Sequence, residues 1–312
     1  MNKKYTISNL MKTITIVLLA SFITNEVCAQ SEPMYSQYMF NMMAVNPAYA
    51  GSRGAIGLNY FGRAQWSGIA GAPTTNAVSL DGSTLDGRFG LGVQLYNDKI
   101  GVYSTNAANF MFATRVKVSD NGVLSGGLQL GIKNSRIDYT SVKNVYDLND
   151  YKFQQNVNNW DPTLGAGIFY NTDKFYAGVS IPNILNSSSV NQNVPKVKDY
   201  HLFIASGYVF DVDDDIKIKP STLIKMASGA PVEIDINANV WYRNMIGLGA
   251  SLRTGDAYVG MAEVQVTRQV RVGYAYDYTT SALKSIAGST NEVMFRYEFG
   301  KESKNVKSTR YF

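Results

Sequence analysis

The stretch MIGLGASLRTGDAYVGMAEVQVTRQVRVGYAYDY, residues 245–278, decides the fold of this chain. Through three consecutive runs its residues change class at every second position. In the last run, two series of residues alternate. One is Val270, Val272, Tyr274, Tyr276 and Tyr278, and the other is Gln269, Arg271, Gly273, Ala275 and Asp277. A period of two indicates β-strands, because successive side chains of a strand point to opposite faces. An apolar face that ends in tyrosines, opposite a polar face, is typical of a transmembrane β-barrel.

A soluble β-sandwich also hides one face of its strands, so alternation alone leaves two folds open. An export signal, strands of about ten residues and connections that alternate between short and long favour the barrel. We therefore predict an all-β fold, a transmembrane antiparallel outer-membrane β-barrel of about 14 strands, an even number that lets the first and last strands pair. The expected strands are residues 54–62, 74–82, 88–97, 104–118, 122–134, 161–171, 174–181, 199–210, 216–226, 231–242, 245–253, 256–266, 268–278 and 290–299.

The lengths of the connections between these strands depend on whether the preceding strand has an even or an odd number. Those after even-numbered strands are tight turns, at residues 119–122, 171–173, 211–215, 243–244 and 267. Those after odd-numbered strands include the long loops 135–160, 182–198 and 279–289, although the links near 228–229 and 254–255 are short. Outer-membrane barrels have short periplasmic turns and longer extracellular loops. We therefore expect the long loops outside the cell.

Length and composition limit the possible classes of protein. The chain has 312 residues, 45% of them hydrophobic, and no composition break suggests two folded domains. Its mean hydropathy of −0.13 excludes a helical membrane protein. A barrel remains possible, since its polar inner residues offset the apolar outer ones.

Residues 1–29 are expected to be a cleaved signal peptide. Lysines precede the apolar run 14–23, and small residues at 27–29 end it. The run is shorter than the roughly 20 residues of a membrane-spanning helix. A lipoprotein anchored at Cys28 is the alternative. However, Asn25, Glu26 and Val27 differ from the leucine and small residues that the processing enzyme favours before a lipid-modified cysteine.

The expected mature chain has 26 basic and 23 acidic residues and no cysteine. The missing cysteine excludes a disulfide scaffold, a thiol enzyme and a Cys-zinc protein. The nearly balanced charge, without a basic cluster, argues against a nucleic-acid partner. The predicted localisation is the outer membrane of a Gram-negative-type bacterium.

Two segments flank the expected barrel, residues 54–299. Residues 30–53, here the N-terminal arm, fit neither a clean helix nor a clean strand, and Pro47 and Gly51 end any regular element. The arm is expected to face the periplasm and to pack against or inside the barrel mouth, and whether it enters the lumen stays open. Residues 300–312 are expected to form a polar periplasmic tail.

The sequence resembles the PorP/SprF family of the type IX secretion and gliding system. The resemblance is carried by Ser36-Gln37-Tyr38-Met39-Phe40-Asn41, by Asn46-Pro47-Ala48-Tyr49-Ala50-Gly51, and by Arg63-Ala64-Gln65-Trp66-Ser67-Gly68-Ile69 leading into Gly71-Ala72-Pro73-Thr74. It implies an outer-membrane barrel that acts in secretion or surface attachment of a large secreted adhesin. The implied partners are type IX secretion proteins, periplasmic envelope proteins and the adhesin, with outer-membrane lipid around the wall.

Candidate partner-contacting residues lie in the arm, in the loops and in the tail. They are Gln37, Tyr38, Phe40, Asn46, Pro47, Tyr49, Trp66, Tyr146, Tyr151, Phe153, Trp160, Tyr311 and Phe312. Loop 135–160 is rich in Asn and aromatic residues, which suit contact with a protein or a glycan. The same composition also suits a loop that folds over its own barrel.

No catalytic, cofactor-binding or metal-binding constellation stands out. His201 has no nucleophile motif near it, and the acidic turn 211–215 lacks the glycine and terminal glutamate of an EF-hand loop. We therefore expect no enzyme, no cofactor and no metal. A passive or gated small-solute channel, lined by Glu233, Asp235, Asn237, Asn239, Glu263, Arg271 and Asp277, is the alternative function, and a soluble glycan-binding sandwich is the third.

Overall fold

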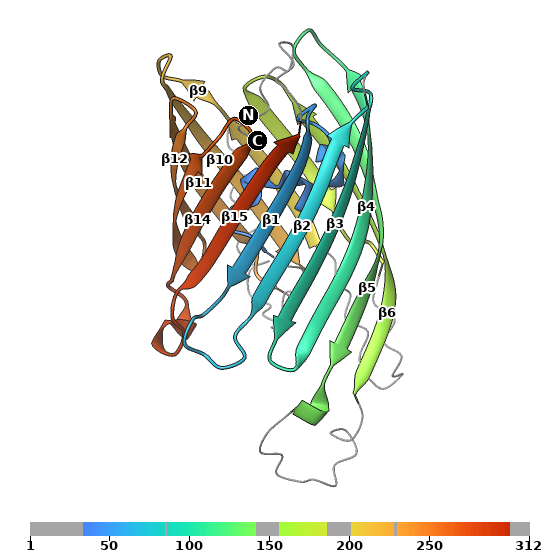
Figure 1. Ribbon diagram of the computed structural model, residues 1–312, viewed down its shortest axis with the longest axis vertical. Coiled ribbons are helices and arrows are strands. Elements are labelled where there is room, and N and C mark those ends of the chain that lie inside the picture. The colour runs from blue at the N-terminus through green and yellow to red at the C-terminus, as the bar shows by residue number, and fades with distance from the viewer. Residues whose placement is uncertain (1–33, 85, 142–155, 186–200, 228–229, 300–312) are drawn as a thin grey trace, which may run out of the picture.

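The computed structural model describes residues 34–84, 86–141, 156–185, 201–227 and 230–299. Its strands form one closed antiparallel barrel, in which β1 pairs with both β2 and β15 (Figure 1). The strands are β1 (Ile56–Ala64), β2 (Thr74–Ser83), β3 (Phe89–Ile100), β4 (Tyr103–Lys117), β5 (Val123–Ile137), β6 (Val157–Asn171), β7 (Phe175–Ile181), β8 (His201–Tyr208), β9 (Phe210–Asp211), β10 (Ile216–Ala227), β11 (Glu233–Tyr242), β12 (Ile246–Arg253), β13 (Ala257–Gln265), β14 (Val270–Thr279) and β15 (Thr290–Phe299). Because β9 only continues β8 beyond Val209, the wall has the fourteen strands expected, and the fold prediction is confirmed.

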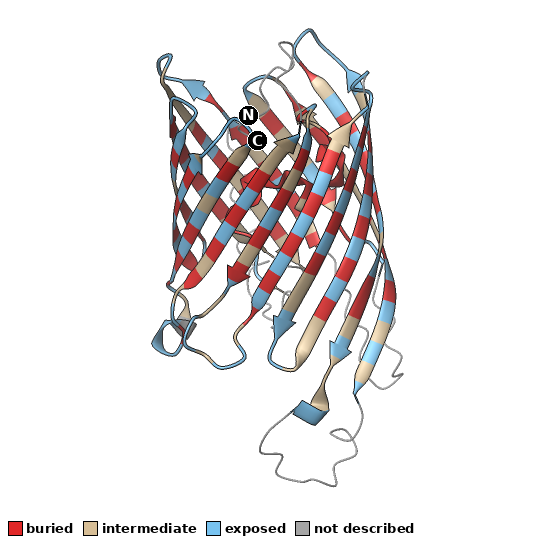
Figure 2. Cartoon of the chain, in the orientation of Figure 1, coloured by how far each residue is buried: buried red, intermediate tan, exposed pale blue. Residues whose placement is uncertain are grey.

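The alternation that predicted the strands is the alternation of the two barrel faces (Figure 2). On β14 the outward Tyr274, Tyr276 and Tyr278 are exposed, whereas Ala275 and Asp277 are buried. The exposed face is apolar on most strands, and the buried face carries the charged and amide side chains. This is the pattern of a wall with lipid outside and a polar interior.

The two ends of the barrel differ as expected. The turns 84–88, 118–122, 172–174, 212–215, 243–245 and 266–269 lie at one end, here the short-turn end. The strand ends joined by the connections 65–73, 138–156, 182–200 and 280–289 lie at the other, here the long-loop end, although the connections 101–102, 228–232 and 254–256 at this end are short. Among the described residues no helix is long and apolar enough to cross a membrane.

The hairpin of β5 and β6 is longer than the sequence suggested. Its pairing continues to Ile137 and Val157, so Trp160 lies in a strand and not in a loop. Asn158 and Asn159 indicate a loop by composition, so the expected strand began only at residue 161. Strand pairing with β5 on one side overrides this local preference, as is usual for β-propensity.

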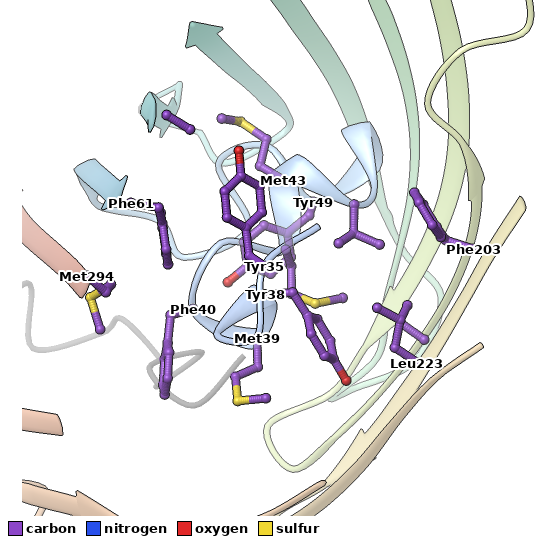
Figure 3. Close-up of a cluster of buried hydrophobic side chains, with 14 of the residues drawn as sticks. Tyr35, Tyr38, Met39, Phe40, Met43, Tyr49, Phe61, Phe203, Leu223 and Met294 are labelled. Carbon is purple, nitrogen blue, oxygen red and sulfur yellow. The ribbon is translucent and has the colours of Figure 1, made fainter. Parts of the chain in front are cut away.

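The described part of the N-terminal arm, residues 34–53, lies inside the barrel, which answers the question that the sequence left open (Figures 1 and 3). It forms three short 3₁₀ turns, η1 (Tyr38–Phe40), η2 (Met42–Ala44) and η3 (Pro47–Tyr49). Two further 3₁₀ turns, η4 (Tyr139–Ser141) and η6 (Ala282–Ser285), lie in the long loops. Nearly every arm residue from 35 to 51 is buried, as expected for a segment surrounded by a wall.

A charge placed on the outer face tests whether that face meets lipid. Leu248 points outward from β12 and is 61% exposed. We expect Leu248→Arg to lower the free energy of folding into lipid vesicles by about 2–4 kcal/mol, because a guanidinium is costly in the hydrocarbon layer. Urea titration of vesicle-folded protein measures this. Asp214→Arg in the exposed turn 212–215 is the control, and an equal loss in both variants would contradict a lipid-facing wall.

Candidate functional site: the lumenal arm and its anchors

The described part of the arm crosses the lumen from one end of the wall toward the other. Ser36 contacts Glu292 and Asp277, which lie near the long-loop ends of β15 and β14. Arg53 pairs at 2.8 Å with Asp81, which lies near the short-turn end of β2. The arm therefore occupies the interior over much of its height.

Glu292 holds the first described residues of the arm, at the long-loop end of the barrel, through its carboxylate. The backbone N–H groups of Ser36 and Gln37 donate to its Oε2 and Oε1 atoms, each at 2.8 Å. The Glu292 side chain is fully buried. A buried carboxylate that accepts two consecutive N–H groups satisfies donors that would otherwise be costly to bury.

Two arginines complete this anchor. Arg63 on β1 donates to Asp277 at 2.9 Å, to Glu292 at 3.0 Å and to the Ser36 hydroxyl at 2.8 Å. Arg253 on β12 donates to the same hydroxyl at 3.2 Å, and that hydroxyl donates to Asp277 at 2.7 Å. We call Arg63, Arg253, Asp277, Glu292 and Ser36 the upper anchor, because they lie at the long-loop end, which is expected outside the cell and is drawn at the bottom of Figure 1.

Further charges extend this network along the wall. Asp235 accepts from Arg253 at 3.1 Å and pairs with Lys225 at 2.8 Å, and Lys225 also pairs with Glu233. Except for Glu233, these side chains are at most 4% exposed. Since buried charges are tolerated only when they are paired and hydrogen-bonded, the network fixes the side chains around the upper anchor.

The middle of the arm is held by burial. Tyr38, Met39, Phe40, Met42 and Met43 are at most 3% exposed, and Figure 3 shows arm side chains beside Phe61, Phe203, Leu223 and Met294 of the wall. The Asn237 side chain donates to the Tyr38 hydroxyl at 2.8 Å. Burial raises the pKa of Tyr38 well above its ordinary value, so the phenol stays neutral.

The C-terminal half of the arm is tied to β6 and β7 through Asn46. Its side-chain nitrogen donates to the Ile168 carbonyl at 3.0 Å, and its side-chain oxygen caps η3 by accepting from Ala48 N at 3.0 Å. Next to it, Tyr49 meets the Phe169 ring edge-on, with 5.3 Å between the ring centroids. A polar and an aromatic contact thus fix η3 against the same part of the wall.

Glycines in the wall make room for the backbone of the arm. A Cβ atom on Gly127 of β5 would lie 2.3 Å from Ala48 N, and one on Gly90 of β3 would lie 1.9 Å from the Ala50 carbonyl oxygen. Arg115 of β4 donates to that same carbonyl. At these positions a side chain and the arm cannot occupy the same space.

The family comparison agrees with this architecture. Residues 27–297 match the family described as "Type IX secretion system membrane protein PorP/SprF". The chain belongs to the PorP/SprF family. It is therefore an outer-membrane barrel component of the type IX secretion system. A comparison with curated protein sequences finds no match.

Solved structures similar to this PorP/SprF barrel include a "CymD monoaromatic hydrocarbon channel", with a TM-score of 0.50 and 12% identity over 89% of this chain and 96% of that one. A FadL homologue of Pseudomonas aeruginosa has a TM-score of 0.46 and 10% identity, over 86% and 95%. The outer membrane protein Omp33 of Acinetobacter baumannii has 0.45 and 10%, over 79% and 100%. At such identities the likeness concerns the fold alone.

The candidate partner-contacting residues lie in different environments. In the PorP/SprF barrel the arm candidates are buried in the lumen: Gln37, Tyr38, Phe40, Asn46, Pro47 and Tyr49. Trp66 is half-buried at the long-loop end, and Trp160 on β6 is 63% exposed. Five candidates lie outside the described residues: Tyr146, Tyr151, Phe153, Tyr311 and Phe312. For all of these residues, contact with a partner stays a prediction.

The sequence analysis did not find the upper anchor. Arg63 was noticed only within a family motif and Asp277 only as part of a polar face, while Glu292 and Arg253 were not singled out. The available signal was the inward position of charged residues on adjacent strands, since β1 pairs with β15 and β15 with β14. Within the described ranges, no group of three or more His, Cys, Asp or Glu is placed to hold a metal ion.

Proposed function

We propose that this PorP/SprF barrel is a non-enzymatic, non-conducting scaffold. It helps to export a large secreted adhesin or to attach it to the cell surface, as part of a secretion system that serves gliding motility. The observation that carries the proposal is the arm, which lies inside the barrel with its side chains buried and is fixed by buried ion pairs. A barrel whose interior is occupied by its own chain offers its two rims and its loops to other molecules.

The two ends of the barrel have different roles in this proposal. The long loops contact the adhesin outside the cell, with Tyr146, Tyr151, Phe153 and Trp160 as contacts. The short turns and the tail, residues 300–312, contact periplasmic parts of the secretion machinery. The arm joins β1 at the short-turn end, so its last residues, near Arg53, are the part that periplasmic proteins meet. The chain reaches the membrane by means of a cleaved signal peptide.

The alternative, a passive or gated small-solute channel, requires a route through the lumen. Conductance in planar lipid bilayers decides between the two functions. We expect the intact protein to show no steady current at moderate voltage, because arm side chains occupy the interior. A variant that lacks residues 34–50 is expected to conduct, which shows that the assay detects an open barrel of this size. Steady conductance of the intact protein would favour the channel.

Cross-linked native envelopes test the proposed partners. We expect the tagged chain to capture type IX machinery and a large adhesin. A variant with Tyr146, Tyr151 and Phe153 changed to serine is expected to lose the adhesin and to keep the machinery. Heat-modifiable mobility on gels checks that both proteins are inserted. If the inserted wild-type barrel captures neither class of protein, the scaffold proposal fails.

A further inference from the structure

Within the part of the chain that the structure describes, the long-loop half of β6 has a neighbouring strand on one side only. On its β5 side β6 pairs along its full length, as far as Val157 with Ile137. On its β7 side pairing begins only at Ala166, opposite Ile181. No strand among the described residues pairs with residues 157–165 on that side, and Figure 1 shows the β5–β6 hairpin extending beyond its neighbours.

Alternation along the strand shows which backbone groups face this open edge. The Leu164 carbonyl accepts from Ile184 N at 2.6 Å, so the backbone groups of Leu164 point away from β5. The Asn159 carbonyl accepts from the Asn134 side chain of β5, so it points the other way. In an antiparallel ladder these directions alternate. The groups of Asn158, Trp160 and Pro162 therefore face the open edge.

Pro162 fits this assignment. Proline has no N–H group, and within sheets it is confined to edge strands or to positions where the missing donor faces away from the ladder. The open edge thus presents the N–H groups of Asn158 and Trp160 and three carbonyl groups. Asn158, Trp160 and Pro162 are all exposed, so these groups are within reach of another molecule.

The chain that leaves β7 does not continue the ladder along β6, because it turns inward. The Pro182 carbonyl accepts from the Gln129 side chain at 3.0 Å, and Asn183 is buried. Gly165 makes room for this turn, since a Cβ there would lie 2.2 Å from the Pro182 carbonyl oxygen. Beyond Ala166, the backbone N–H of Ile184 donates a hydrogen bond to this edge at the Leu164 carbonyl.

We propose that the β6 edge at residues 158–162 binds an extended segment of a partner polypeptide as an added antiparallel strand. Only an extended backbone offers carbonyl and N–H groups at the two-residue spacing of this edge, and strand addition to an open sheet edge is an established mode of peptide recognition. The exposed Trp160 ring gives such a segment an apolar contact beside the hydrogen bonds. That the segment belongs to a secreted protein rests on the proposed function, but the pairing itself does not.

Hydrogen exchange of the purified protein in detergent micelles tests whether the edge is open. We expect the amides of Asn158 and Trp160 to exchange fast and those of Asn159 and Asp161, which point toward β5, to exchange slowly. Equal protection of all four amides would mean that the protein's own chain covers the edge, and the proposal would then be wrong.

Binding of a defined probe tests the recognition. The probe is a synthetic strand-forming peptide of alternating threonine and valine with terminal lysines, and its control is the same peptide with N-methyl groups on alternate amides. We expect the first peptide to protect the amides of Asn158 and Trp160 and the methylated one to bind about tenfold more weakly, because it lacks the donors that the carbonyls accept. Equal binding of both peptides would refute strand addition.

Variants of the edge separate the backbone donors from the Trp160 ring. Trp160→Pro removes an N–H to which no strand of the described residues pairs, and Trp160→Ala removes only the ring. We expect Trp160→Pro to weaken probe binding several-fold more than Trp160→Ala, and Pro162→Thr, which restores a donor, to strengthen it. Heat-modifiable mobility confirms folding. If Pro162→Thr and Trp160→Pro bind the probe equally well, no strand is added here. These tests need no adhesin, so they can succeed where the scaffold proposal fails.

Discussion

Replacing Gly127 with valine is expected to drive η3 from its place in the lumen and to open a conducting route through the barrel. The first side-chain carbon at this position would lie 2.3 Å from Ala48 N and 2.4 Å from Ala48 Cα, which are backbone atoms. A small shift of the η3 backbone would not relieve this clash without breaking the hydrogen bond from Asn46 to the Ile168 carbonyl of the wall, so we expect η3 to leave its position. Overpacking of this kind costs about 1–3 kcal/mol or displaces the intruding segment.

Gly126→Val is the matched control for this prediction. Gly126 is the preceding residue of β5 and faces outward, and a Cβ there would meet nothing within 4 Å. Planar-bilayer current and trypsin cleavage at Arg53 are the two measurements. We expect both to increase in Gly127→Val and neither to change in Gly126→Val. A closed, protease-resistant Gly127→Val barrel would mean that η3 does not need its observed position against β5.

The wall of this barrel could be predicted from the sequence because its determinants are local. Each strand carries its own alternation, and turns such as 212–215 and 266–269 carry their own signals. The register around Tyr276 follows from the requirement that apolar residues face lipid, since a shift of one residue would turn every side chain to the wrong face. The hairpin of β5 and β6 was predicted too short because Asn158 and Asn159 favour loops locally.

The site could not be predicted in the same way because its determinants are distant in sequence. Arg63 and Glu292 are 229 positions apart, and nothing in either stretch indicates that they meet at Ser36. The arm has no periodic pattern because wall surrounds it on all sides, so Tyr38 and Met39 can both be buried. The family motifs within the arm marked this segment as important, but they did not indicate that it lies in the lumen.

Replacing Glu292 with alanine is expected to destabilise the upper anchor more than the loss of any exposed ion pair. The change leaves the N–H groups of Ser36 and Gln37 buried without their acceptor. It also removes one of the two carboxylates that pair with Arg63. Removal of one partner from a buried ion pair costs about 3–5 kcal/mol, because the other charge stays buried. We expect a loss of that size in urea titrations of the micelle-bound protein.

Asp211→Ala is the control, because Asp211 pairs with Lys174 and Lys217 at a partly exposed site. Exposed pairs contribute about 0–1 kcal/mol, so this variant is expected to unfold near the wild-type urea concentration. Conductance separates two accounts of how the arm is held. If Glu292→Ala is less stable but still closed, the buried aromatic and methionine side chains keep the arm in place and the anchor only sets its register. If Glu292→Ala conducts, the anchor itself retains the arm. An unfolding transition equal to that of Asp211→Ala would contradict both accounts, because it would mean that the carboxylate of Glu292 contributes no more than a surface charge.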